Sequence, residues 1–363
     1  MIPVLSVRNL QMHLYTRWGI TRAVDDISFD LHEGETLGIV GESGCGKSMT
    51  ALTLMRLLPK PAARIIGGQV LLDGDDLLAK SEPEMRKIRG RKMAMILQDP
   101  QTSLNPVFSI ETQLAEALEL RQEQAAEPGF GAKLRARAVQ ALRMVNVADP
   151  ERRLASYPHQ LSGGMKQRVV GAMAIAPRPR VLIADEPTTA LDVTIQLQYL
   201  NLLKRLQQQT GVSIIFITHD FGVVAKMCDR AAVFYAGRIV EQGTVRKLFS
   251  QPAHPYTQAL MASVPRLEER VEKLYSIEGK PPALFDLPDG CRFAPRCPHA
   301  FDRCTETYPS DFEVEPNHAA ACWLHDRPSP PAPLPCEGEG SDPGLAVRLP
   351  LSAPERGLGG EVR

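Results

Sequence analysis

The sequence lacks an excess of charge of either sign. Its 363 residues hold 42 lysines and arginines against 42 aspartates and glutamates, so it has no basic field of the kind that attracts nucleic acid. It also lacks an apolar stretch near the ~20 residues that span a bilayer, and its first residues do not combine a charged segment with a long apolar one. We therefore expect a chain that is neither secreted nor membrane-spanning on its own, with no nucleic-acid partner.

Closely spaced cysteine pairs are missing as well. Three of the seven cysteines lie apart, and the other four are separated by gaps of five, six and seventeen residues. These four are Cys291, Cys297, Cys304 and Cys322. Zinc sites usually contain cysteine pairs with about two to four residues between them, so the spacing argues against zinc. Four thiolates in a proline-rich, loop-like segment could still hold a metal centre in place of a hydrophobic core. Iron–sulfur, zinc and free thiols therefore remain open.

The most informative stretch is residues 36–48, TLGIVGESGCGKS. An apolar run leads into three glycines, a lysine and a serine, which predicts a strand, a phosphate loop and a helix. The glycines let successive backbone N–H groups turn inward toward a phosphate at the positive end of the helix dipole. Lys47 would reach the outer phosphates, and the Ser48 hydroxyl would bind the bridging Mg²⁺. The expected nucleotide contacts are Gly41, Ser43, Gly44, Gly46, Lys47, Ser48 and Met49.

Polar side chains follow three further apolar stretches, each of which predicts a buried strand. Gln98 ends the first, Asp185 and Glu186 end the second, and His219 follows the third. Ligands bind at such strand ends in open α/β sheets. Asp185 could hold Mg²⁺, and Glu186 could polarise a water for in-line attack. Gln98 could contact the metal or that water, and His219 could donate to a terminal phosphate.

A second candidate phosphate site begins at Ser162. The segment LSGGMKQRV, residues 161–169, predicts a helix that opens with small residues and free N–H groups. One chain needs only one such site for each nucleotide. Ser162, Gly163 and Gly164 therefore imply that another molecule carries this site to the same nucleotide.

The remaining segments predict smaller parts of the fold. Residues 4–31 mostly alternate apolar and polar side chains, which indicates antiparallel strands, and Tyr15 in the loop between them could stack on a nucleotide base. Residues 110–147 have the composition of a helical insertion. Residues 327–363 are dominated by proline, glycine, serine and charge, which predicts a disordered tail.

Together, GESGCGKS, Gln98, LSGGMKQ, VLIADEP, TTALD and His219 resemble an ABC-type ATPase domain in their order and approximate spacing. The resemblance covers about residues 4–250. It implies an α/β P-loop ATPase fold with a RecA-like core, an antiparallel β subdomain and a helical subdomain at about residues 100–178.

The same resemblance implies roles for the motif residues. Two subunits pair head to tail, so that the Ser162 segment of one closes over the ATP that Lys47 holds in the other. Glu186 is then the catalytic base, Asp185 and Ser48 are the Mg²⁺ residues, and Gln98 also meets the transporter. His219 is the switch at the γ-phosphate. The aromatic residue that usually stacks on adenine falls nearest Leu14, one place before Tyr15.

The rest of the chain resembles a narrower group, the ATP-binding subunits of oligopeptide and dipeptide importers. The segments that carry this likeness are HPYTQAL at 254–260, SVP at 263–265, GKPP at 279–282, GCRFAPRCPHAFDRC at 290–304, and Cys322-Trp323. The likeness implies a 4Fe-4S cluster at the four cysteines. We therefore expect an ATP-binding domain at 1–250, an importer-type C-terminal region at 251–326 and a tail at 327–363.

The sequence thus predicts an ATP hydrolase that uses ATP and Mg²⁺ to energise uptake of di- and oligopeptides by a bacterial ABC importer. We expect it at the cytoplasmic face of the inner membrane. Its expected partners are a second ABC ATPase subunit, identical or different, two membrane-spanning permease subunits, and a periplasmic or lipid-anchored substrate-binding protein. Nickel or another small solute is an alternative cargo. A soluble ABC ATPase that acts on nucleic acid is disfavoured, because the sequence lacks long coiled coils and tandem ATPase domains.

Overall fold

The structure is a computed structural model that describes residues 2–99, 103–119, 130–189, 191–263 and 276–326. The described residues belong to one compact unit that ends at Asp326. The expected tail at 327–363 lies outside them. Within the described residues, no helix is both long and apolar enough to cross a membrane.

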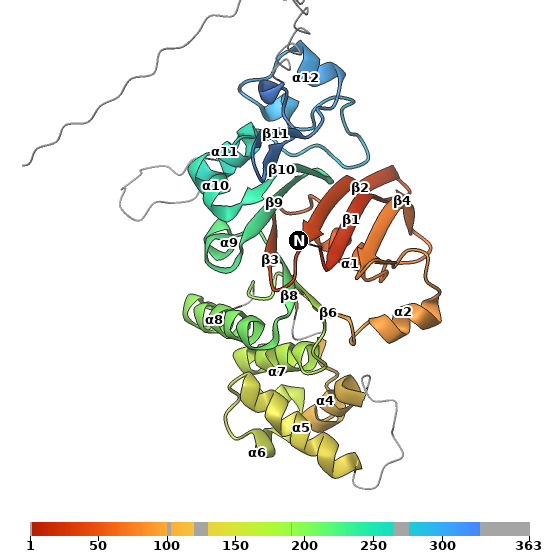
Figure 1. Cartoon of the computed structure of the whole chain (residues 1–363), viewed down its shortest axis with the longest axis vertical. Helices are drawn as coiled ribbons and strands as arrows, with labels where there is room; N and C mark the ends of the chain where they lie inside the picture. Colours follow the sequence, from red (N-terminus) through yellow and green to blue (C-terminus); the bar gives the residue numbers. More distant parts are fainter. Residues whose placement is uncertain (1, 100–102, 120–129, 190, 264–275, 327–363) are drawn as a thin grey trace, which may run out of the picture. The chain divides into compact units, whose positions relative to one another are not determined.

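An antiparallel sheet forms the N-terminal part of the fold, drawn in red and orange in Figure 1. Its strands pair in the order β2-β1-β4-β5, and they are β1 (Leu5–Thr16), β2 (Gly19–Leu31), β4 (Ala63–Leu72) and β5 (Asp75–Asp76). The hairpin of β1 and β2 follows the period-two pattern of the sequence, because one face packs in the core and the other does not. Helix α2 (Glu82–Ile88) follows, and its Ser81 N–H donates to the Glu84 carboxylate 2.7 Å away in a capping box.

A second, eight-stranded sheet carries the phosphate loop. Its order is β11-β12-β10-β9-β3-β8-β7-β6. Its strands are β3 (Thr36–Val40), β6 (Met93–Ile96), β7 (Val181–Asp185), β8 (Ser213–Thr218), β9 (Arg230–Tyr235), β10 (Arg238–Thr244), β11 (Phe312–Glu315) and β12 (His318–Ala320). Strands β6, β7, β8, β3 and β9 run parallel. β3, β7 and β8 are buried along their whole length, which explains why they read as continuous apolar runs.

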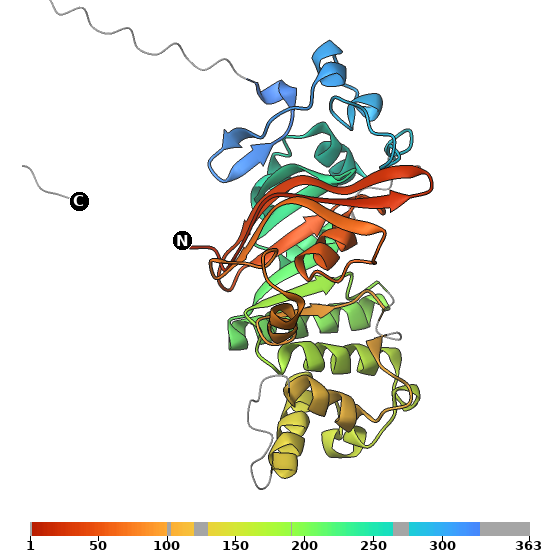
Figure 2. The ribbon, with the colours of Figure 1, turned by 90° about the vertical axis from the view of Figure 1, so that its right-hand side faces the viewer.

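Some helices cover the faces of this sheet, and others, among them α4, α5 and α6, form a helical group beside it (Figures 1 and 2). The α-helices are α1 (Lys47–Leu54), α4 (Ile110–Glu119), α5 (Phe130–Met144), α6 (Pro150–Leu154), α7 (Gly163–Ile175), α8 (Val193–Thr210), α9 (Phe221–Met227), α10 (Val245–Ser250), α11 (Pro255–Ala262) and α12 (Asp302–Glu306). Short 3-10 turns lie at Pro158–Gln160, Ala294–Arg296 and Trp323–His325. Helices α4, α5 and α6 pack with α7 around a shared core that continues to β6, as the composition of residues 110–147 predicted.

The C-terminal region completes the large sheet. β12 pairs with β10, with Glu241 opposite Ala320. The buried Glu241 carboxylate accepts the N–H groups of Ala253 and His254, both at 2.8 Å, and lies 2.7 Å from His318 Nε2. One carboxylate therefore ties together β10, β12 and the start of α11.

A buried ion pair makes a second link between the ends of the described chain. Arg292 donates to the carboxylate of Asp25 on β2 and to the Ala236 carbonyl. Arg238 approaches the same carboxylate at 3.4 Å. Burial opposes ionisation of Asp25, but these two arginines hold the pKa of its carboxyl below the ordinary value. The carboxylate on the N-terminal hairpin is thus charged and paired with the C-terminal region.

Candidate active site

The phosphate loop joins β3 to α1. A Cβ at residue 41 would lie 2.2 Å from the Phe234 carbonyl oxygen, and one at residue 46 would lie 2.1 Å from that of Ala23, so glycine is required at both positions. The Lys47 ammonium donates to the carbonyls of Gly41 and Glu42 at 2.8 and 2.9 Å. The loop therefore curls around the buried Lys47 ammonium, and the expected contact of Lys47 with phosphate stays a prediction.

The other loop residues differ in exposure. Ser43 and Gly44 are exposed at the loop tip, whereas Met49 is half-buried and packs against the core. Ser43 and Gly44 are therefore open to a nucleotide, and Met49 faces the protein interior.

The two residues expected to hold Mg²⁺ meet beside the loop. The Ser48 hydroxyl donates to Asp185 Oδ1 at 3.0 Å. Asp185 is only 4% exposed, and burial raises the pKa of its carboxyl despite the Ser48 hydrogen bond. A hydroxyl and a carboxylate are hard oxygen donors, and Mg²⁺ completes such sites with substrate phosphates and waters. The donor set therefore fits this ion.

Three predicted residues converge on a second cluster around Glu186. Gln98 Nε2 donates to Glu186 Oε2 at 3.2 Å, and His219 Nδ1 lies 3.1 Å from Oε1. The Thr189 hydroxyl also donates to Oε2, at 2.8 Å. Gln98 thus contacts Glu186 rather than the Ser48–Asp185 pair, and its expected contact with Mg²⁺ stays a prediction.

Hydrogen bonding keeps Glu186 ionised. Burial by itself would raise the pKa of this carboxyl, but the hydrogen bonds from His219 and Thr189, helped by the charges of His219 and Lys47, hold it below the ordinary value. Its backbone is fixed in the left-handed region, with φ of 45°. At neutral pH the carboxylate can accept a proton, as a general base must.

One edge of the sheet explains why these groups meet. Gln98, Glu186, His219 and the phosphate loop each follow a strand, and β6, β7, β8 and β3 are parallel neighbours. The carboxyl ends of parallel strands lie at one edge, where such sheets bind ligands. The sequence predicted these residues from the phosphate-loop motif and from the ends of apolar strands, and their roles stay a prediction.

The Ser162 segment lies at the N-terminus of α7. The Ser162 hydroxyl caps this helix by accepting the Met165 N–H at 3.4 Å. Ser162 and Gly163 are exposed, and Gly164 is half-buried. This helix end presents free N–H groups to the outside of the molecule.

Tyr15 lies at the end of β1 and is 41% exposed. The Arg64 guanidinium lies 4.9 Å from the centroid of its ring, while Leu14 packs against the core. A base would have to use the ring face that Arg64 leaves free, and stacking on Tyr15 stays a prediction.

The four C-terminal cysteines are free thiols that gather in one region. The Cys322 thiol is within electrostatic range of Cys291, Cys297 and Cys304, and burial raises its pKa to about 11. Within the described residues, however, no three histidine, cysteine, aspartate or glutamate side chains lie close enough together to hold a metal ion. The metal centre expected from the sequence is therefore not supported by this geometry.

Three contacts at the site escaped the sequence analysis. Thr189 belongs to the TTALD segment, which was noticed only as a family motif. Tyr256 and Arg296 both contact Glu42 of the phosphate loop, although they belong to HPYTQAL and to the cysteine-rich segment. Their motifs were visible, but nothing in their spacing relates them to the loop.

Family models and known proteins give a consistent result. The model described as "ABC transporter" matches residues 24–189, and the one described as "Oligopeptide/dipeptide transporter, C-terminal region" matches residues 240–304. The chain is 52% identical over 321 residues to a "Probable peptide ABC transporter ATP-binding protein" of Sinorhizobium fredii, covering 88% of this chain and 94% of the relative. It is 49% identical to the dipeptide transport ATP-binding protein DppD of Bacillus subtilis, covering 90% and 96%.

Solved structures agree on the fold. A dimeric ATP-binding cassette in a post-hydrolysis state with ADP and Pi matches with a TM-score of 0.59 and 28% identity, covering 67% of this chain and 99% of that one. The cbiO1 protein of Clostridium perfringens matches with a TM-score of 0.57 and 27% identity, covering 69% and 92%. The expected fold class is therefore confirmed. The chain belongs to the ABC transporter family, among the ATP-binding subunits that carry the oligopeptide/dipeptide transporter C-terminal region.

Proposed function

We propose that this chain hydrolyses ATP to energise the uptake of di- and oligopeptides through an ABC importer. The observation that carries the proposal is the meeting of the Ser48–Asp185 pair and the Glu186 cluster at one sheet edge beside the phosphate loop. The relatives named for dipeptide and oligopeptide transport, at 49% and 47% identity, support peptides as the cargo.

The residues divide the work of hydrolysis. The phosphate-loop N–H groups and Lys47 bind the phosphates of ATP. Ser48 and Asp185 would hold Mg²⁺, which would neutralise negative charge on the phosphates. Glu186 accepts a proton from the attacking water, and His219 and Gln98 orient the carboxylate and the terminal phosphate.

We propose that two such subunits act together. The exposed N-terminus of α7 at Ser162 would contact the ATP held by a second ABC ATPase chain, identical or different. A similar cassette forms a dimer with ADP and Pi bound, which supports this arrangement. ATP then closes the pair, and hydrolysis releases it.

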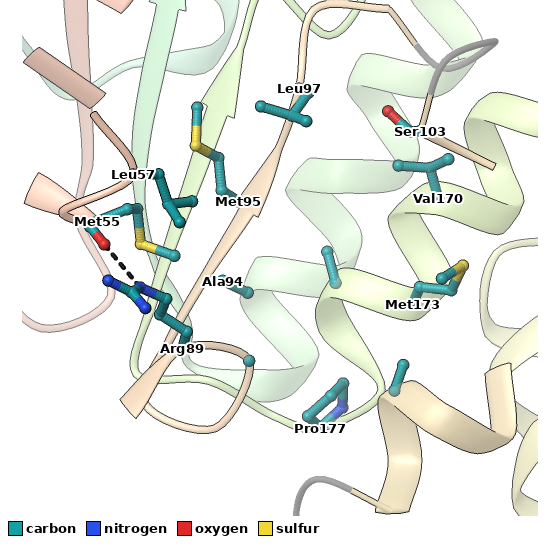
Figure 3. A pocket seen from close by; sticks show the side chains of 13 residues that line it. Met55, Leu57, Arg89, Ala94, Met95, Leu97, Ser103, Val170, Met173 and Pro177 are labelled. Carbon is teal, nitrogen blue, oxygen red and sulfur yellow. Dashed lines mark hydrogen bonds between the residues drawn. The ribbon is translucent and has the colours of Figure 1, made fainter. Parts of the chain in front are cut away.

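A membrane subunit would dock in an apolar groove on this chain. The groove has a volume of about 320 Å³ and lies between β6 and α7, with Met95, Leu97, Val170 and Met173 among its lining residues (Figure 3). Leu97 directly precedes Gln98, so a partner seated here would sense the nucleotide site. Permease subunits, a substrate-binding protein and a position at the cytoplasmic face of the inner membrane complete the proposal.

Leu57→Glu is expected to break this docking. Leu57 is 46% exposed and lines the groove, so a buried carboxylate there should weaken binding of the permease subunits by at least about tenfold. ATP-dependent peptide uptake by reconstituted vesicles should fall with it, while ATP binding by the isolated chain stays at the parent level. Ile66→Glu is the matched control, because Ile66 is 45% exposed but lies on β4, outside the groove. Equal uptake by the parent and the Leu57 variant would refute the docking site.

We also propose a 4Fe-4S cluster at Cys291, Cys297, Cys304 and Cys322; the likeness to the oligopeptide/dipeptide transporter C-terminal region supports it, whereas the geometry of the described thiols does not. The Cys291 N–H donates to the Cys304 carbonyl at 2.8 Å, which places the backbones of two of the four cysteines side by side. Four cysteine thiolates are the usual ligands of such a cluster. The cluster would cross-link the loops of residues 251–326.

Cys297→Ser is expected to lower the iron and acid-labile sulfide bound by protein purified without oxygen. The parent should carry about four of each per chain if all four thiols bind one 4Fe-4S cluster. Cys228→Ser is the control, because Cys228 caps the end of α9 and is not one of the four proposed cluster ligands. Zinc near one per chain, or no metal in the parent, would overturn the cluster.

A further inference from the structure

The second residue of the phosphate loop is bound by the C-terminal region. Arg296 Nη1 donates to Glu42 Oε2 at 2.9 Å, and Nη2 donates to Oε1 at 3.1 Å. The Arg296 side chain is 4% exposed and that of Glu42 is 26% exposed. The pair is therefore two-pronged, with a buried guanidinium and a partly exposed carboxylate, and bidentate charged hydrogen bonds of this kind are among the stronger side-chain contacts.

Arg296 is itself held in place before it reaches the loop. Its Nε donates to the Glu278 carbonyl at 3.0 Å, and Nη1 also donates to the Tyr235 hydroxyl at 3.2 Å. Burial opposes the charge, but the hydrogen bonds to Glu42 and Tyr235 raise the pKa of the guanidinium above its ordinary value. Contacts outside the phosphate loop therefore already hold the planar guanidinium of Arg296 in its orientation toward Glu42.

A tyrosine of the same region binds the loop backbone. The Tyr256 hydroxyl accepts the Glu42 N–H at 3.0 Å. The Tyr256 ring is fully buried and packs on Tyr235, with centroids 4.5 Å apart, and on Phe293 at 5.3 Å. Lys47 donates to the Glu42 carbonyl, so Glu42 connects this phosphate-binding lysine to the aromatic cluster.

We infer that Arg296 and Tyr256 are positioning residues that fix the phosphate loop for ATP through Glu42. Without Arg296, the Glu42 carboxylate would stand unpaired beside the site of the triphosphate and would repel it. The inference rests on the proposed ATPase function. It also makes the cysteine-bearing region part of the nucleotide site, since Arg296 directly precedes Cys297.

The test compares Arg296→Ala with the parent full-length chain, using ATP binding followed by a fluorescent ATP analogue and single-turnover hydrolysis at saturating ATP. We expect the Kd for ATP to rise about tenfold, with the single-turnover rate constant changed less than about twofold. Adding Glu42→Gln to Arg296→Ala removes the unpaired carboxylate and should return most of the lost affinity. A residue that acts only by packing would not be rescued in this way.

Arg303→Ala is the matched control. Arg303 belongs to the same region, but it pairs with Asp326 and lies over the Trp323 ring at 3.6 Å, so its removal should leave the Kd for ATP unchanged. If Arg296→Ala does not fold, Arg296→Lys keeps the charge without the fork and should raise the Kd about threefold.

The outcomes distinguish a failure of this inference from a failure of the proposed ATPase function. A parent that binds ATP while Arg296→Ala and Arg296→Lys bind it equally well would overturn the inference alone. A loss of affinity that Glu42→Gln does not relieve would also overturn it. A parent chain that fails to bind ATP would overturn the proposed function and the inference with it.

Discussion

Glu186→Gln is expected to lower the rate of ATP hydrolysis by about 100- to 1000-fold while ATP still binds. The amide keeps the size of the side chain, and its one oxygen can still accept the hydrogen bonds of Gln98 and Thr189. It cannot act as a base toward water. Gln98, Thr189 and His219 surround the carboxylate, so the substitution should leave the loop and its Ser48–Asp185 neighbour in place. Bound ATP should then hold two subunits together for longer than in the parent.

The measurements are steady-state phosphate release and the fraction of dimer in size-exclusion chromatography with ATP and Mg²⁺. Glu151→Gln serves as the control, because Glu151 is exposed and pairs with Arg143 on the helical group, far from the catalytic edge in sequence and fold. Turnover within about threefold of the parent would show that another group is the base, since a general base contributes at least about 100-fold.

Arg292→Met is expected to lower the free energy of unfolding by about 3 kcal/mol. Arg292 is 4% exposed and Asp25 is 6% exposed, so removal of the arginine leaves a carboxylate buried with only the more distant Arg238 near it. The pKa of Asp25 should rise as a result. Because the parent pKa lies below the ordinary value, the pair stabilises the fold at neutral pH, and this contribution is lost as pH falls through the acidic range.

Urea unfolding at neutral pH measures the effect. Adding Asp25→Asn to Arg292→Met removes the unpaired charge and should recover part of the loss. Arg303→Met tests a half-exposed arginine of an ion pair and should change the free energy by less than about 1 kcal/mol. A loss for Arg292→Met no larger than that of Arg303→Met would show that the buried pair adds little net stability.

The candidate catalytic residues at the carboxyl edge of the parallel strands could be predicted, because their positions follow simple rules. Ser48 and Asp185 lie 137 positions apart, yet the phosphate-loop motif predicted Ser48 and a strand end predicted Asp185. The loop and the strand end lie at the same edge of a parallel sheet. The same rule located Gln98, Glu186 and His219. Family resemblance then supplied roles that geometry by itself does not assign.

The contacts of the C-terminal region could not be foreseen. Glu42 and Arg296 are 254 positions apart. Glu42 follows β3, but Arg296 lies in a short 3-10 turn outside the parallel strands, so no periodicity relates them. β12 has only three residues, too few for an alternating pattern to reveal its pairing with β10. Cysteine spacing likewise fixed which thiols were candidates but not the distances between them. Such contacts depend on how loops close in three dimensions, which local patterns do not encode.

The pairing of early and late residues also constrains how the chain folds during synthesis. Asp25 pairs with Arg292, which lies 267 positions later. Glu241 contacts His318, and Glu42 pairs with Arg296. A chain of which only the first 250 residues exist therefore still lacks Arg292, Arg296 and His318, the later partners of these three carboxylates. At about 5–20 residues per second, the ATP-binding core remains incomplete for several seconds after its own last motif has emerged. The contacts that Tyr256 and Arg296 make with Glu42 of the phosphate loop can therefore form only after these residues have been synthesised.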